Sequence, residues 1–155
     1  MFVLGLDVGL SDLYSRLLDI PTQGAPVALG DVCVVPNSSA DHQELCVWLQ
    51  TYSAGTALTA VVIESASVYW ERIAVCLHDA GFAVSVVNAV QIKYFAKSLM
   101  RRGKTGKMDA ELIARYGDDR HSDCPHTGRS PPYHRPPARR RPSVQEQPDM
   151  MYSKR

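Results

Sequence analysis

The sequence of 155 residues lacks any apolar run that approaches the ~20 residues needed to cross a membrane. Its first residues, Met-Phe-Val-Leu-Gly-Leu-Asp, contain no basic segment and reach a charge at Asp7, so they do not fit a signal peptide. We therefore expect a cytoplasmic protein with no membrane partner.

Zinc-ligand spacing is absent as well. The cysteines at 33, 46, 76 and 124 form no C-x-x-C pair, and the five histidines have no matching spacing. Three of the four cysteines fall inside apolar patterns, which predicts buried, reduced thiols.

The composition changes sharply near Gly117. Hydrophobic residues make up 45% of the chain, which is enough for one domain with a core. Residues 1–117 hold 9 Lys+Arg against 11 Asp+Glu, whereas residues 118–155 hold 8 against 5 and seven of the ten prolines. This predicts a folded domain over 1–117 and a disordered Pro/Arg-rich tail over 118–155.

Apolar runs and amphipathic patterns predict an α/β fold. Strands are expected at residues 2–8, 13–19 and 27–35, as an antiparallel meander, and later at 57–64 and 82–87. Helices are expected from a capping box at Asp41 and Glu44 to Tyr52, from a cap at Ser65 or Ser67 to Gly81, from Asn88 to about Arg101, and from Met108 to Tyr116. The order βββαβαβα, with flanking helices, predicts a mixed sheet with helices packed on it.

Three carboxylates occupy positions where an acid is unexpected. Asp7 lies in an apolar strand, Glu64 ends another, and Asp109 starts a helix. Each has an ordinary structural explanation, such as a strand end or the positive end of a helix dipole. Together they suggest ligands for a hard divalent cation, Mg²⁺ or Mn²⁺, on one sheet edge. Gly5 would allow another backbone to approach the first strand.

A basic stripe precedes Asp109. Lys93, Lys97 and Arg101 recur at i, i+4 and i+8, and the basic run continues with Arg102, Lys104 and Lys107. An ordinary solvated helix face explains such a stripe. Its position directly before Asp109 favours a phosphate-binding surface beside a metal site.

Several short pieces in this order carry a family resemblance. They are Gly5–Val8, Glu64–Trp70, Val87–Asn88 with Gln91, Phe95–Lys97, Lys104–Thr105, Asp109–Ala110, and Leu112, Ala114 and Arg115. Residues 1–117 resemble the N-terminal domain of IS110-family transposases, the DEDD type with a RuvC-like (RNase H-like) fold. The resemblance implies a Mg²⁺-dependent DNA recombinase domain with Asp7, Glu64 and Asp109 as three of its four acids. It also implies DNA, a structured guide RNA in some members, and self-association of the intact enzyme.

The sequence departs from the family pattern at two places. The family motif reads Lys-Thr-Asp-x-x-Asp-Ala, and Gly106 stands at the first Asp position, which removes one carboxylate and predicts weaker cation binding. A family member would continue with a coiled coil and a domain bearing a nucleophilic serine, and no such pattern follows Gly117. These departures predict a degenerate, inactive fragment whose residues after about 118 are translated out of frame.

Three alternatives remain open from the sequence. The tail could be a genuine nucleic-acid-binding segment using Arg139, Arg140 and Arg141. The Gly-Leu-Asp-Val-Gly turn at residues 5–9 also fits a sugar-kinase or actin-like ATPase, although such proteins need further glycine-rich phosphate loops. The third alternative is a module without chemistry, either a nucleic-acid-binding remnant or a structural protein.

Overall fold

The computed structural model describes residues 1–52, 59–100 and 106–122 of the chain. Six strands form one sheet: β1 (Phe2–Val8), β2 (Asp12–Asp19), β3 (Val27–Ala28), β4 (Cys33–Pro36), β5 (Thr59–Glu64) and β6 (Ala83–Val87). The helices are α1 (Ser39–Tyr52), α2 (Glu71–Asp79), α3 (Ala89–Ser98) and α4 (Gly106–Ser122). No helix in this described part is long and apolar enough to span a membrane.

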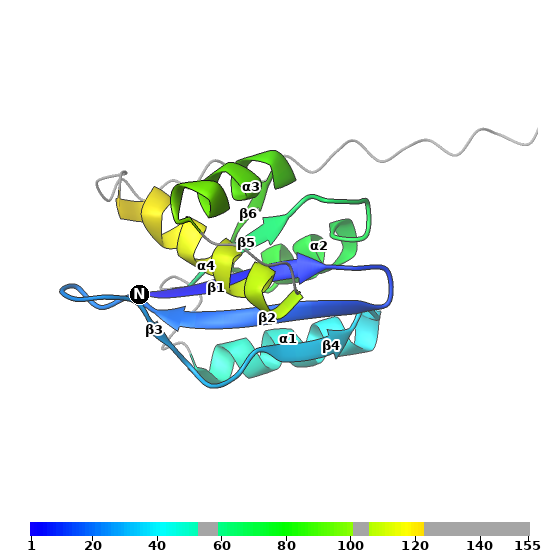
Figure 1. Cartoon of the computed structure of the whole chain (residues 1–155). Coiled ribbons are helices and arrows are strands. Elements are labelled where there is room, and N and C mark those ends of the chain that lie inside the picture. Colours follow the sequence, from blue (N-terminus) through cyan, green and yellow to red (C-terminus); the bar gives the residue numbers. More distant parts are fainter. Residues whose placement is uncertain (53–58, 101–105, 123–155) are drawn as a thin grey trace, which may run out of the picture.

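The sheet is mixed, as the pattern predicts (Figure 1). The strands lie in the order β3-β2-β1-β5-β6, and β4 also pairs with β2. The pairing of β1 with β2 is antiparallel, whereas β1 with β5 and β5 with β6 are parallel. The carboxyl ends of β1, β5 and β6 therefore meet at one edge of the sheet.

Both faces of the sheet are covered. Successive residues of a strand point to opposite faces, and Leu4 and Leu6 of β1 join the core beneath α1 and α2. Val3 of β1 joins the other core, with Leu18, Val62 and the buried faces of α3 and α4. Figure 1 shows α4 lying across β1 and β2 on this second face.

The predicted strand over 27–35 is wrong as one element. A turn interrupts it, and Gly30 in that turn has a φ of 68°, a left-handed conformation suited to glycine. Arg16 of β2 donates a hydrogen bond of 2.6 Å to the Gly30 carbonyl. Two short strands, β3 and β4, therefore pair with β2 where one was expected.

Two predicted helix caps are also wrong. The cap of α1 is Ser38, whose hydroxyl accepts from the Asp41 backbone N–H and donates to the Asp41 carboxylate, so the cap lies three residues earlier than predicted. The N-cap of α2 is Trp70, which makes no side-chain cap hydrogen bond. Ser65 instead donates to the carbonyl of Val87, and so ties the end of β5 to β6.

The remaining helix ends agree with the sequence in part. Asn88 caps α3 by accepting from the Val90 N–H at 2.8 Å, as predicted. Gly81 follows α2 with a φ of 89°, also as predicted. However, α3 ends at Ser98, because Met100 adopts a φ of 53°, a left-handed conformation that is incompatible with a right-handed helix. In turn, α4 spans Gly106–Ser122 and extends past both predicted limits, Met108 and Tyr116.

Candidate functional site

Asp7 and Glu64 lie on neighbouring strands, at the same edge and on the same face of the sheet. The parallel register places Leu6 of β1 opposite Ile63 of β5, and Asp7 and Glu64 are the next residues. Alternation puts Asp7 on the face of Val3 and Glu64 on the face of Val62, which is the face that α3 and α4 cover. Both acids are half-buried and both engage other groups of the protein.

Gly5 brings the third acid to this face. A β-carbon at Gly5 would lie 2.3 Å from the Ala110 carbonyl oxygen and 2.4 Å from the Ala114 backbone nitrogen, so the backbone of α4 rests directly on β1. This confirms the predicted close approach at Gly5. Asp109, half-buried in the first turn of α4, immediately precedes Ala110. The three predicted acids therefore come from elements that meet at one place.

The donor chemistry of this edge fits a hard divalent cation, since carboxylates are its preferred protein ligands. The positions of the side chains do not form a complete ligand set. Among the residues that the structure describes, no three His, Cys, Asp or Glu side chains converge closely enough to hold one ion. Gly106, the first residue of α4, supplies no fourth carboxylate.

A hydrogen-bond network that starts from buried His42 fixes the turn that follows Asp7. Asn37 donates from its side chain to the Gly9 carbonyl at 2.8 Å and from its backbone to the Ser11 carbonyl at 2.7 Å. His42 of α1 is buried, and its Nε2 lies 2.7 Å from the Asn37 side-chain oxygen. Sequence analysis missed this network, because Asn37 resembles an ordinary strand-ending residue after Pro36.

The environment of His42 disfavours its charged form. Desolvation lowers the pKa of His42 below its ordinary value of 6.5, and the Arg72 charge adds to this effect, while Asp41 partly opposes it. Neutral His42 with the proton on Nε2 donates to the Asn37 carbonyl oxygen. The network is therefore complete without a buried charge.

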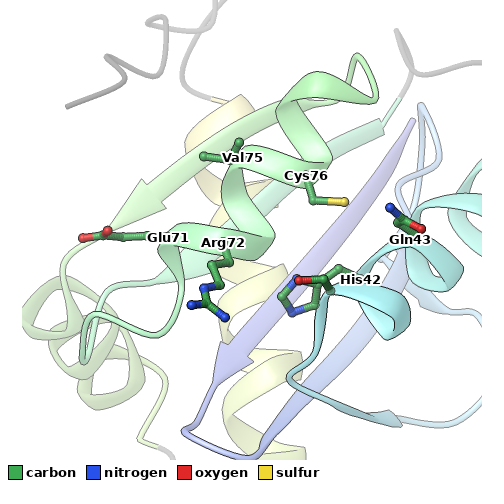
Figure 2. A pocket seen from close by; sticks show the side chains of 7 residues that line it. His42, Gln43, Glu71, Arg72, Val75 and Cys76 are labelled. Atoms are coloured by element: carbon green, nitrogen blue, oxygen red, sulfur yellow. The ribbon is translucent and has the colours of Figure 1, made fainter. Parts of the chain in front are cut away.

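A pocket lies between α1 and α2 on the opposite face of the sheet (Figure 2). His42 and Gln43 line it from α1, and Glu71, Arg72 and Cys76 line it from α2. Cys76 also contacts Cys46, with 3.5 Å between the sulfurs, and both thiols are free. Cys46 is buried as predicted, whereas the prediction is wrong for Cys33, which is exposed at the edge of the sheet.

The predicted basic residues are described only in part. Lys93 and Lys97 are exposed on α3. Arg101, Arg102 and Lys104 lie outside the described residues, and the side chain of Lys107 does too. The described helix α3 ends at Ser98, so it carries Lys93 and Lys97 of the predicted stripe.

Solved structures share the fold. RuvC from Thermus thermophilus and the same protein in complex with a Holliday junction substrate cover 74% of this chain and 90% of theirs. The TM-scores are 0.55 and 0.53, at 18% and 15% sequence identity. This likeness confirms the predicted RuvC-like, RNase H-like fold.

The relatives found by sequence are gene-inverting proteins by name. The pilin gene-inverting proteins of Moraxella bovis and Moraxella lacunata are each 39% identical over 85 residues, which is 55% of this chain and 26% of theirs. The chain thus spans about a quarter of the length of these curated relatives. A family model described as a transposase, for the DEDD transposases of IS110, matches residues 5–131, and the match continues past Gly117. The chain belongs to the DEDD transposases of the IS110 family.

Proposed function

We propose that this chain is the cation-binding domain of a DNA transposase, in which Asp7, Glu64 and Asp109 bind Mg²⁺ or Mn²⁺. The observation that carries the proposal is the shared edge and face of Asp7 and Glu64, with α4 held over them at Gly5. Carboxylates grouped in this way are the protein ligands that hard divalent cations prefer.

The chemistry proposed is cleavage and transfer of DNA phosphodiesters. A divalent cation held by these carboxylates would polarise the phosphoryl oxygen, and a pair of cations would stabilise the attacking and leaving oxygens. The protein's own part is to hold the carboxylates on rigid strands and to keep the turn after Asp7 fixed through Asn37 and His42. The exposed lysines of α3, on the same face, would bind DNA phosphates.

We further propose that this copy binds its cation weakly. Gly106 stands at the first position of α4, where the family motif has an acid, so the site has three carboxylates in place of four. Fewer negative ligands lower the affinity for a hard cation. Guide RNA binding and self-association, which the resemblance implies for intact family enzymes, belong to the same proposal.

The test is titration calorimetry of the full chain with MnCl₂ and with MgCl₂ at constant ionic strength. Asp7→Asn should abolish the binding heat, because it removes a ligand charge while keeping the side-chain shape. Asp19→Asn is the matched control, since Asp19 ends the antiparallel β2 opposite Phe2, at the far end of β1. Equal binding by the Asp7→Asn variant and the unmodified chain would sink the proposal.

A further inference from the structure

The orientation of α3 is fixed by its inner side. Ile92 is buried, and Phe95 packs edge-on against Tyr116 of α4 with 5.4 Å between ring centroids. The Tyr116 hydroxyl donates to the Gln91 side chain at 3.3 Å. These contacts leave the opposite side of α3 facing solvent.

That solvent-facing side combines apolar and basic residues. Val90, Lys93, Tyr94 and Lys97 follow one another at i, i+3, i+4 and i+7, so they share one helical face. Val90 is 54% exposed and Tyr94 is 64% exposed, so an aliphatic and an aromatic side chain lie open to solvent beside the two lysines. The ten residues of α3 include two lysines and no acid.

The lysines of this face are available to an anion. Among the described residues, neither Lys93 nor Lys97 forms an ion pair. Lys97 places its Nζ 5.4 Å from the Tyr94 ring centroid, within the range of a cation–π contact. The ring is thus held beside a cation while most of its surface remains accessible.

We propose that the outer face of α3 binds an unpaired nucleic-acid strand, with a base stacked on Tyr94 and phosphates on Lys93 and Lys97. A duplex offers phosphates to a helix face but hides the faces of its bases. An aromatic ring between cations matches the surfaces that bind single strands, where each stacked base contributes ~1–3 kcal/mol. This inference rests on the proposed DNA-binding function and adds the class of substrate: DNA with unpaired bases.

The position of α3 supports this substrate. Asn88, the cap of α3, directly follows β6, whose carboxyl end lies at the same edge as Glu64. A strand on α3 would therefore lead toward the carboxylates. Opened or branched DNA provides such an unpaired strand beside the phosphodiester to be cut.

The test measures binding of a labelled 12-residue oligo-dT, the same length of oligo-U, and a blunt 12-base-pair duplex to the full chain in EDTA. Fluorescence anisotropy gives each affinity without metal. Tyr94→Ala should weaken oligo-dT binding about tenfold, the loss of one stacked base, and leave duplex binding nearly unchanged. Tyr94→Phe should retain binding, because the ring remains.

Matched controls separate this face from the rest of the surface. Tyr52→Ala removes another exposed tyrosine, on α1 across the sheet, and should change nothing. The double change Lys93→Ala with Lys97→Ala should weaken both DNA forms and reduce the salt dependence of binding, whereas Arg72→Ala on α2 should not.

Four outcomes would overturn the inference. Equal losses by Tyr94→Ala on duplex and oligo-dT would mean that no base stacks on the ring. If the duplex binds as tightly as the single strand, the inference that the substrate has unpaired bases is wrong, while the proposed DNA-binding function remains. Absence of binding to every nucleic acid, with self-association that Tyr94→Ala abolishes, would assign the face to a second copy of the chain. Tighter binding of oligo-U than oligo-dT would keep the stacking of a base on Tyr94 but would replace DNA by RNA as the class of strand, against the inference.

Discussion

A β-carbon at Gly5 would lie 2.3 Å from the carbonyl oxygen of Ala110, so the absence of a side chain on β1 sets the height of α4 above the sheet. Asp109 precedes Ala110 in that helix, and Asp7 follows Gly5 by two residues on the same face of β1. The spacing between these two acids therefore depends on the missing side chain of a glycine.

Replacing Gly5 by alanine should destabilise the protein and weaken cation binding together. The added carbon meets helix backbone, which cannot move aside as a side chain can, and overpacking of this kind costs ~1–3 kcal/mol. Urea unfolding and Mn²⁺ titration measure the two effects. Gly117→Ala is the control at the same interface: its β-carbon would meet side-chain atoms of Val62 and Val3, so we expect a smaller loss. A larger loss for Gly117→Ala would contradict this account.

Restoring the missing acid should strengthen cation binding. Gly106→Asp adds a carboxylate at the start of α4, one turn before Asp109. An acid there also complements the helix dipole, an effect of ~0.3–1 kcal/mol on stability. Gly106→Asn separates the two contributions, because it offers the same shape without the charge. Calorimetry should show tighter Mn²⁺ binding for the Asp variant alone; equal affinities for Asp and Asn would exclude Gly106 as the weak point.

His42 should make the protein less stable in mild acid. Burial lowers the pKa of His42 below 6.5, so the folded state binds fewer protons than the unfolded state over the interval below 6.5. The stabilising contribution of neutral His42 to the free energy of unfolding is then fully present above pH 6.5. It is lost as the pH falls toward the lowered pKa, by at most ~1.4 kcal/mol per pH unit. Urea unfolding at pH 5, 6 and 7 measures this slope.

Two variants isolate the His42 contribution. His42→Gln keeps a donor for Asn37 and cannot titrate, so its stability should be flatter between pH 5 and 7. His78→Gln alters an exposed histidine at the end of α2 and should preserve the slope of the unmodified chain. An unchanged slope in His42→Gln would assign the acid sensitivity to other groups.

The thiols should differ strongly in reactivity. Burial and the neighbouring Cys76 raise the pKa of Cys46 to about 12, and the thiolate is the reactive form. Cys33 is exposed and should be alkylated before Cys46 by iodoacetamide at pH 8. Peptide mass spectrometry over time gives both rates, and urea should accelerate Cys46 far more than Cys33. Labelling of Cys46 as fast as Cys33 in the folded protein would contradict the packing of α1 against α2.

The sequence predicts the strands that form the core because their patterns are unambiguous. Residues 2–8 are almost continuously apolar, and burial of β1 on both faces explains this. The region of 27–35 is different, because both of its strands lie at the edge of the sheet and are mostly exposed. An edge strand needs little apolar patterning, so the sequence pattern does not distinguish two short strands separated by a turn at Gly30 from one continuous strand.

The acids of the candidate site could be predicted from the sequence, whereas the hydrogen bonds that hold the neighbouring turn could not. Asp7 and Glu64 stand out because a carboxylate interrupts or ends an apolar strand. The link from His42 through Asn37 to Gly9 joins residues up to 33 positions apart, and no local pattern marks it. The lysines on the outer face of α3 could be predicted from the sequence. Tyr94 could be assigned to that face only after the structure had shown that Phe95 and Ile92 lie on the side of α3 that packs against α4.

The packing of α4 over β1 joins the first and last described elements of the chain. During synthesis, the apolar side chains of Val3, Leu18 and Val62 emerge long before the helix that covers them. One half of the core therefore assembles late, and the early chain carries an uncovered apolar sheet face in the meantime. A polypeptide that stopped before Gly106 would leave exposed the part of this face that α4 covers, so α4 is needed for the stability of the domain.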